Sequence, residues 1–180
     1  MDMVAVAYRD NLHKSNIHFA KKAFDCIRET RESFVIIGDF SHFFDSLDHA
    51  YLKKQICDVL DVEILPPDYY AVFKNITKYS IWKLTELLKL NNLTDTEEDI
   101  QILNSKRRVL SEKEFKKHKK EFIIRHKENY GIPQGSAISA VLANIYMTTI
   151  DEKMDKLAGK FNGLYMRYSD DFIIILPRIS

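Results

Sequence analysis

Two acidic features of the chain follow or interrupt apolar, strand-like segments. Asp39 ends the run FVIIGD, and the pair Asp170-Asp171 interrupts the run MRYSDDFIIIL. Carboxylates beside buried strands are costly unless their charge is compensated, and converging carboxylates repel each other unless a divalent cation lies between them. Two Mg²⁺ ions held by such oxygens can support phosphoryl transfer. The pair Asp170-Asp171 alone, however, also fits an ordinary hairpin turn.

The sequence around these acids predicts the elements that position them. SFVIIGDF is a β-branched and aromatic run typical of a central strand, and LYMRYSDDFIIIL predicts two strands joined by a tight turn at residues 169–171. Asp48 is a candidate N-cap, because its carboxylate can accept the free amides of a first helical turn. Helices are expected over about 15–31, 49–60, 66–90 and 137–157, with a polar loop over 91–99. The pattern is mixed α+β, with helices between non-adjacent strands.

The bulk composition fits one globular domain with an attached lobe. The chain has 180 residues, of which 46% are hydrophobic and 29% charged. Cys26 and Cys57 lie far from any CxxC or histidine spacing, which favours free thiols in a reducing compartment over a disulfide or a zinc site. No signal peptide is apparent, and the longest apolar runs are far too short to span a bilayer. We therefore expect a cytoplasmic protein without a membrane association.

The net charge of +1 hides a strongly basic segment. Residues 106–127 contain ten Lys or Arg and three Glu, a balance of +7, so the rest of the chain carries −6. A basic segment beside an acidic remainder suggests a surface for a polyanion, and its composition favours contact with phosphates over base edges. A solvated face of one or two exposed helices remains the alternative. Phe115 and Phe122, two helical turns apart, are expected to anchor such a helix.

Three segments together resemble a known family. GDFSHFFDSLDH, GIPQGSAISAVLANIYM and RYSDDF occur in the order, and near the spacing, of the palm motifs of reverse transcriptases. The chain resembles the bacterial branch, which includes group II intron, retron and phage-defence enzymes. AYRDNLHKS, near the start, is similar to the fingers motif that precedes them. The resemblance covers most of the chain except about residues 60–129, where the spacing is long and the basic stretch matches nothing in the family.

The resemblance implies specific roles for single residues. Asp39 matches the metal-binding aspartate of the first palm motif, Asp170 the principal metal ligand of the third, and Asp171 the second acid of that pair, with a lesser role. Phe44 falls where the family places a steric gate, although it also fits a core position; a ring under the sugar leaves no room for a 2′-hydroxyl. The remaining candidates are implied to bind substrate. Gln134 and Gly135 would lie beside the incoming nucleotide, and Arg9 would pair with the triphosphate, a role for which Lys14 is the weaker candidate.

The implied architecture is the right-handed polymerase fold, with a small antiparallel palm sheet backed by helices. We assign residues 1–32 to partial fingers, 33–60 to the palm with the first motif, 61–130 to a helical and basic insertion, and 131–180 to the palm with the second and third motifs. The chain stops directly after the third motif, and no thumb follows. We therefore expect a fragment whose activity on its own is in doubt.

The implied function is RNA-directed DNA synthesis on a primer. It would use two Mg²⁺ ions, with Mn²⁺ as a substitute, an RNA template, a DNA primer and deoxynucleoside triphosphates. Template-independent or protein-primed DNA synthesis is an alternative within the same chemistry. A non-catalytic, maturase-like RNA-binding scaffold is an alternative from another class, against which the intact acids argue. The sequence leaves open the template, the priming mode, the oligomeric state and the role in phage defence or a retroelement.

Overall fold

The computed structural model describes residues 4–8 and 13–178. The chain divides into two compact units, one formed by Met1–Thr77 with Asn129–Ser180 and the other by Lys78–Glu128. The second unit lies inside the segment 61–130 that the sequence sets apart, whereas residues 61–77 join the first unit. The assignment of these parts to fingers and palm stays a prediction.

A three-stranded antiparallel sheet occupies the described part of the first unit. Its strands are β1 (Ser33–Asp39), β4 (Leu164–Tyr168) and β5 (Asp171–Pro177), in the order β1-β5-β4. All three strands lie where the sequence predicts them, but the expectation that β1 is a central strand is wrong. Within the described residues β1 pairs with β5 alone, so it is an edge strand, and its residues 34–37 are exposed. β5 is central because it pairs with β1 on one side and with β4, its neighbour in sequence, on the other.

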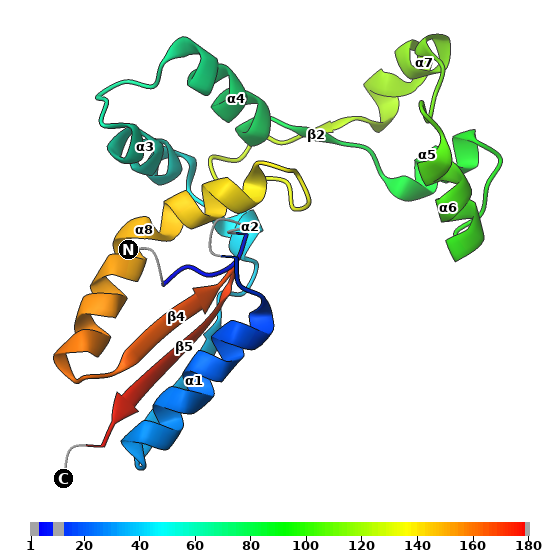
Figure 1. Ribbon diagram of the computed structural model, residues 1–180. Coiled ribbons are helices and arrows are strands. Elements are labelled where there is room, and N and C mark those ends of the chain that lie inside the picture. Colours follow the sequence, from blue (N-terminus) through cyan, green and yellow to red (C-terminus); the bar gives the residue numbers. More distant parts are fainter. Residues whose placement is uncertain (1–3, 9–12, 179–180) are drawn as a thin grey trace. The chain divides into compact units, whose positions relative to one another are not determined.

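Helices pack on both faces of the β4–β5 pair, whereas the apolar residues 34–37 of β1 are exposed. α1 (Asn16–Thr30) packs on one face, where Ala23 contacts Met166 and Ile175, and α8 (Ser139–Lys160) packs on the other, where Ala158 contacts Tyr165. Figure 1 shows the blue helix α1 and the orange end of α8 flanking the strands. The sheet end of the first unit is therefore a layered α/β/α arrangement.

The largest core lies where α8 meets α3 (His49–Leu60). The short helix α2 (Phe43–Ser46) and the helix α4 (Pro67–Thr77) complete this region. Asp48 caps α3 as predicted, because its carboxylate accepts a hydrogen bond from the backbone N–H of Tyr51 at 2.7 Å. The fully or nearly buried members of this core include Leu47, Leu52, Ile56, Ile132, Ala143 and Met147.

Gly38 has a packing role just before the candidate acid Asp39. It lies directly opposite Phe172 in the β1–β5 register. A Cβ atom at position 38 would collide with the ring of Phe172. Phe40, two residues later, packs against the same ring with centroids 5.3 Å apart. The glycine thus lets an aromatic ring lie across the strand and fix the end of β1 against β5.

The predicted helix over 66–90 is wrong in its second half. α4 ends at Thr77, the short strand β2 (Ser80–Ile81) follows, and a separate helix α5 covers Leu84–Leu90. The break arises because β2 pairs with the strand β3 (Ile124–Arg125), so a long-range ladder replaces the local helical preference. The expected loop over 91–99 also ends early, because Thr96 caps the helix α6 (Glu97–Ser105).

The second unit carries an exposed basic helix, α7 (Glu112–Phe122), in which no residue is buried. Its N-terminus is fixed by a capping box between Ser111 and Glu114. Phe115 and Phe122 both pack near Trp82, with ring centroids 6.0 and 5.9 Å from the indole. This confirms that the two phenylalanines anchor the helix.

Within the described residues, no helix combines the length and apolarity that crossing a membrane would require.

Candidate active site

Asp39 and Asp171 occupy directly opposed positions where β1 meets β5. The backbone N–H of Phe40 donates to the carbonyl of Asp170 at 3.1 Å, so the neighbouring pair Asp39–Asp171 is a non-hydrogen-bonded one. Side chains of such a pair project from the same face and approach more closely than those of hydrogen-bonded pairs. The register therefore brings two carboxylates, far apart in sequence, to one end of one face.

Asp170 lies in the two-residue turn between β4 and β5. The preceding residue, Ser169, has a φ of 59°, as expected for the first position of a turn of the mirror-image type that joins antiparallel strands. Asp170 is half-buried, whereas Asp39 and Asp171 are exposed. The three carboxylates thus share the same end of the sheet, but only Asp170 sits in the turn.

The three carboxylates have the chemistry of magnesium ligands, but they do not form a full set of protein ligands around an ion. Among residues 4–8 and 13–178, no group of three or more His, Cys, Asp or Glu is placed to hold a metal ion. Mg²⁺ in polymerase-type sites is usually bound by one or two carboxylates together with substrate phosphates and water. The opposed pair Asp39–Asp171, with Asp170 beside it, therefore fits an ion that takes its remaining ligands from a substrate.

Phe44 lies in α2 and is 8% exposed, within the main core and edge-on to Phe43. Its carbonyl accepts a hydrogen bond from the N–H of Ile132 at 2.9 Å, and the carbonyl of Leu47 accepts one from Gly131 at 2.8 Å. These bonds tie α2 to the loop that carries the next two candidates. The structure therefore links the candidate gate and the candidate nucleotide loop through the backbone.

Gln134 and Gly135 are both exposed in this loop. Gly135 has a φ of +83°, a conformation that favours glycine, and a side chain there would meet no atom within 4 Å. The positive φ thus favours glycine at this position, and the space that a side chain would occupy there is open. After the loop, the hydroxyl of Ser139 donates to the carbonyl of Pro133 at 2.5 Å and secures the start of α8.

Arg9 lies outside the described residues. The preceding residue, Tyr8, is described, and its hydroxyl lies 3.4 Å from the Ser169 hydroxyl. Its ring is also 6.5 Å, centroid to centroid, from that of Tyr168. The chain therefore passes the carboxylate turn at Tyr8. Lys14 is exposed, just before α1.

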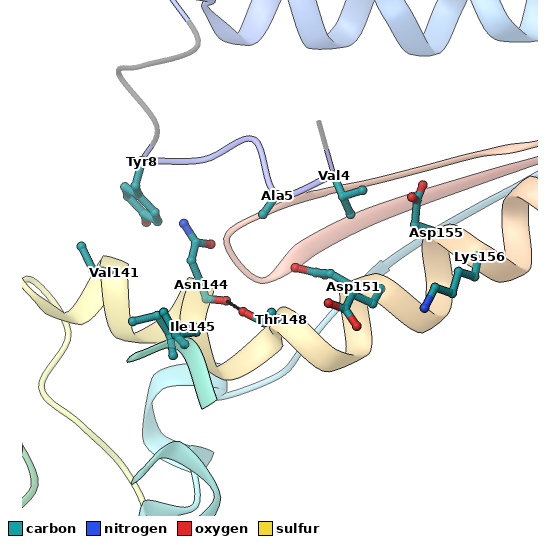
Figure 2. A pocket seen from close by; sticks show the side chains of 12 residues that line it. Val4, Ala5, Tyr8, Val141, Asn144, Ile145, Thr148, Asp151, Asp155 and Lys156 are labelled. Atoms are coloured by element: carbon teal, nitrogen blue, oxygen red, sulfur yellow. Dashed lines mark hydrogen bonds between the residues drawn. The ribbon is translucent and has the colours of Figure 1, made fainter. Parts of the chain in front are cut away.

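A pocket of the first unit lies beside α8 and reaches Tyr8, whose hydroxyl is close to Ser169 in the carboxylate turn. It has a volume of about 610 Å³ and is bounded by the segment Val4–Tyr8 and by α8. Figure 2 shows Asn144, Asp151 and Asp155 of α8 around it. Among its described lining residues there is none of the predicted site residues. A second, apolar groove of about 450 Å³ runs between α1 and the sheet and includes Tyr168 and Asp171.

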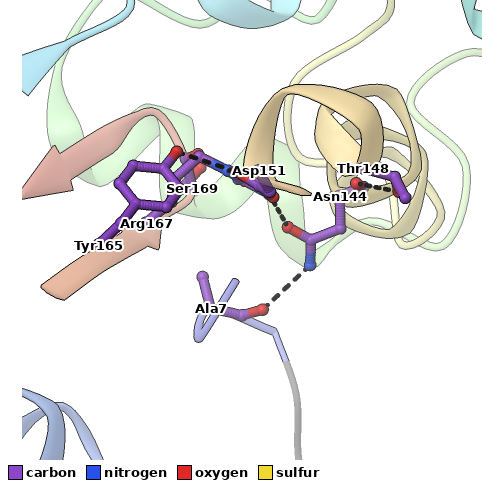
Figure 3. A network of polar contacts seen from close by, with 7 residues as sticks. All are labelled: Ala7, Asn144, Thr148, Asp151, Tyr165, Arg167 and Ser169. Carbon is purple, nitrogen blue, oxygen red and sulfur yellow. Dashed lines mark hydrogen bonds and ion pairs between the residues drawn. The ribbon is translucent and has the colours of Figure 1, made fainter. Parts of the chain in front are cut away.

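A buried polar network behind the turn was not predicted from the sequence. The guanidinium of Arg167 in β4 forms an ion pair with Asp151 of α8, at 2.7 Å between Nη2 and Oδ2 (Figure 3). Tyr165 donates to the same carboxylate at 2.9 Å, and burial, together with the charge of Asp151, raises the pKa of the Tyr165 hydroxyl. A signal was present: Arg167 interrupts an alternating apolar strand, and Asp151 falls in an amphipathic helix.

The second unit presents a candidate nucleic-acid surface on α7. Lys113, Lys116, Lys117 and Lys120 follow an i, i+3, i+4, i+7 spacing and are all exposed. This lysine face, defined by these four residues, lies on the side of the helix opposite Phe115 and Phe122, which pack near Trp82. Glu112 pairs with Lys116 at 2.9 Å. The aromatic contacts therefore hold the helix so that its lysines point into solvent.

Comparison with known proteins yields a similarity of fold. No family model matches the chain, and no curated protein matches its sequence. Solved structures with a similar fold include those of telomerase, an enzyme related to reverse transcriptases. The mixed arrangement of helices and a small antiparallel sheet therefore resembles a part of telomerase.

Three telomerase structures define the extent of the similarity. The Candida albicans enzyme in complex with a TWJ fragment of telomeric RNA is 17% identical, with a TM-score of 0.52, and the match covers 97% of this chain and 27% of that one. The apo enzyme of Candida tropicalis truncated from its C-terminal domain is 17% identical, with a TM-score of 0.51, and the match covers 97% of this chain and 30% of that one. The Candida tropicalis enzyme in complex with a TWJ fragment of telomeric RNA is 19% identical, with a TM-score of 0.52, and the match covers 97% of this chain and 25% of that one. The chain thus spans less than a third of these neighbours.

Proposed function

We propose that this chain forms the fingers–palm part of a reverse transcriptase of the bacterial type, which adds deoxynucleotides to a primer on an RNA template. The observation that carries the proposal is the direct opposition of Asp39 and Asp171, with Asp170 in the adjoining turn. Like charges at directly opposed positions destabilise a sheet. Such an arrangement is understandable when a divalent cation is bound during function.

Two Mg²⁺ ions, with Mn²⁺ as a substitute, would supply charge neutralisation at the reacting phosphate and activation of the primer hydroxyl. Asp39, Asp170 and Asp171 would hold them. Asp170 is the candidate for the principal ligand, and Asp171 for the lesser one. The half-buried turn position of Asp170 differs from the exposed strand positions of the other two acids, which supports unequal roles.

The nucleotide would lie between the carboxylates and the loop that carries Gln134 and Gly135. Gly135 leaves open space beside the backbone, so a substrate can approach closely there. Phe44 would act as the steric gate against ribonucleotides, and its backbone bond to Ile132 supports this by fixing the gate to the nucleotide loop. Arg9 would bind the triphosphate through its guanidinium.

The template would be RNA and the primer DNA. The telomerase neighbours, two of which are complexes with telomeric RNA, support an RNA-related function for this fold. The lysine face of α7 would contact phosphates of the bound nucleic acid, because lysines act as point charges and carry no base specificity. A purely structural RNA-binding scaffold would have no need for the like-charged pair at the end of the sheet.

Primer extension by the full-length protein tests the proposal. The reactions contain Mg²⁺, the four deoxynucleoside triphosphates, a labelled DNA primer, and either an RNA template, a DNA template or no template. We expect products that copy the RNA sequence. Products of equal yield without template would indicate template-independent synthesis, and RNA binding without any incorporation would indicate a scaffold.

A further inference from the structure

Arg167 of β4 is a fully buried side chain, with a side-chain exposure of 0%. Its Nε lies 2.9 Å from Oδ1 of Asp151, and its Nη2 lies 2.7 Å from Oδ2, which makes the pair bidentate. Nη2 also donates to Oδ1 of Asn144 at 3.1 Å. A guanidinium held on both edges in this way has little freedom to rotate.

The remaining nitrogen of the guanidinium reaches the turn that carries the candidate metal ligand. Nη1 donates to the backbone carbonyl of Ser169 at 2.5 Å. That carbonyl belongs to the peptide bond that joins Ser169 to Asp170, so the contact fixes the plane from which the Asp170 backbone continues. Asp170 in turn accepts a hydrogen bond from Phe40 through its own carbonyl.

The same arginine also holds the N-terminal segment. Its backbone N–H donates to the carbonyl of Val4, and its carbonyl accepts from Val6, each at 2.9 Å. Asn144, which accepts from Arg167, donates to the carbonyl of Ala7 at 3.1 Å (Figure 3). One residue therefore connects the carboxylate turn, helix α8 and the segment that leads to Arg9.

Stability alone does not explain a buried ion pair at this place. The desolvation of two charges offsets much of their attraction, and replacing a buried pair by apolar residues of similar volume is often neutral or stabilising. Loss of a single partner, by contrast, leaves an uncompensated buried charge. What apolar residues cannot reproduce is the charged hydrogen bond to the Ser169 carbonyl.

We propose that the Arg167–Asp151 pair is a positioning device that sets the backbone of the turn and hence the place of the Asp170 carboxylate. Arg167 acts through Ser169 and does not itself contact the reacting groups. The inference rests on the proposed function for its catalytic consequence, but the positioning of the turn is independent of it.

The decisive variant replaces both charges, Arg167→Met with Asp151→Leu. It removes the bond to Ser169 without leaving a lone buried charge. Hydrogen exchange of the Phe40 amide, which donates to Asp170, reports the turn directly, and the Ile36 amide in the middle of β1 reports the sheet. We expect the Phe40 amide to exchange at least about 10-fold faster at unchanged Ile36 exchange. In primer extension, kcat should fall by up to about 100-fold with little change in the KM for nucleotide.

Tyr165→Phe is the matched control, since it removes a bond to the same Asp151 carboxylate without touching the turn. It should leave the Phe40 exchange and kcat unchanged. If the double variant does not fold, Arg167→Lys replaces it, because one ammonium can pair with Asp151 but cannot also reproduce the planar contact with Ser169. Faster Phe40 exchange in either folded variant supports the inference.

Unchanged Phe40 exchange in the folded variant overturns the inference, and so does a fall in kcat of the same size for Tyr165→Phe. Failure of the proposed function looks different. In that case the wild-type protein incorporates no nucleotide on any template, while the exchange experiment still shows whether Arg167 positions the turn.

Discussion

Asp39 and Asp171 lie directly opposite each other on adjacent antiparallel strands, at a non-hydrogen-bonded position where side chains approach closely. Without a cation, the two carboxylates repel each other. The arrangement makes the folded state sensitive to the charge at either position, and it makes a bound divalent ion stabilising.

The first prediction concerns this repulsion. In metal-free buffer, Asp39→Asn should raise the Tm by up to about 4 °C, because it removes one of two like charges. Addition of Mg²⁺ should raise the Tm of the wild type more than that of the variant. Differential scanning calorimetry measures both effects. Asp155→Asn, at an exposed position of α8, is the control and should change neither. An equal response of wild type and Asp39→Asn to Mg²⁺ would exclude Asp39 as a ligand.

The second prediction separates the gate from the core at Phe44. Phe44→Leu and Phe43→Leu change neighbouring buried rings of the same cluster, 8% and 7% exposed, so both should destabilise the protein to a similar, modest extent, by less than about 1.5 kcal/mol. Only Phe44→Leu should increase incorporation of ribonucleotides relative to deoxynucleotides. The measurement is the ratio of kcat/KM for the two substrates. A ratio that stays the same, or that rises equally in both variants, would make Phe44 a core residue only.

The third prediction concerns the lysine face of α7. Replacing Lys113, Lys117 and Lys120 by Gln should weaken binding of unrelated RNA sequences about equally. It should also make the slope of log K for binding against log salt concentration less negative, by up to roughly 0.7–0.9 for each phosphate that is no longer neutralised. The control replaces Lys153, Lys156 and Lys160 of α8 by Gln. These lysines are also exposed, and their replacement removes the same charge. A salt titration of binding compares the two triple variants. Parallel slopes in wild type and the α7 variant would mean that this face is only solvated.

The sequence predicted local elements well where one pattern decides the structure. β1 follows its β-branched and aromatic run, although at the edge of the sheet and not at its centre. β4 and β5 follow the alternating run, and Asp48 caps α3 as its type and position indicate. The helix expected over 66–90 failed because the pairing of β2 with β3, a distant segment of the chain, overrides local preference. Such a ladder cannot be inferred from propensity at either segment alone.

The sequence motifs single out the candidate acids but do not give their geometry. The motifs predict that Asp39 and the pair Asp170-Asp171 belong to one site. The sequence could not show that Asp39 lies opposite Asp171 in particular. The register between distant strands depends on packing such as that of Phe172 over Gly38. The ion pair of Arg167 with Asp151 escaped for the same reason. Arg167 stands out within its apolar strand, but only the docking of α8 on β4 shows that Asp151 is its partner.

The effect of Asp170→Asn on primer extension by the full-length protein, with RNA binding measured on the same preparation, tests the proposed metal site at its principal ligand. Removing one charge from the proposed metal site should abolish nucleotide addition on an RNA template. RNA affinity should stay near the wild-type value, because under the proposal phosphate contacts elsewhere supply it. Asp155→Asn should extend the primer normally. Extension by Asp170→Asn at the wild-type rate would rule out Asp170 as a metal ligand, and a loss of RNA binding equal to the loss of synthesis would indicate a folding defect instead.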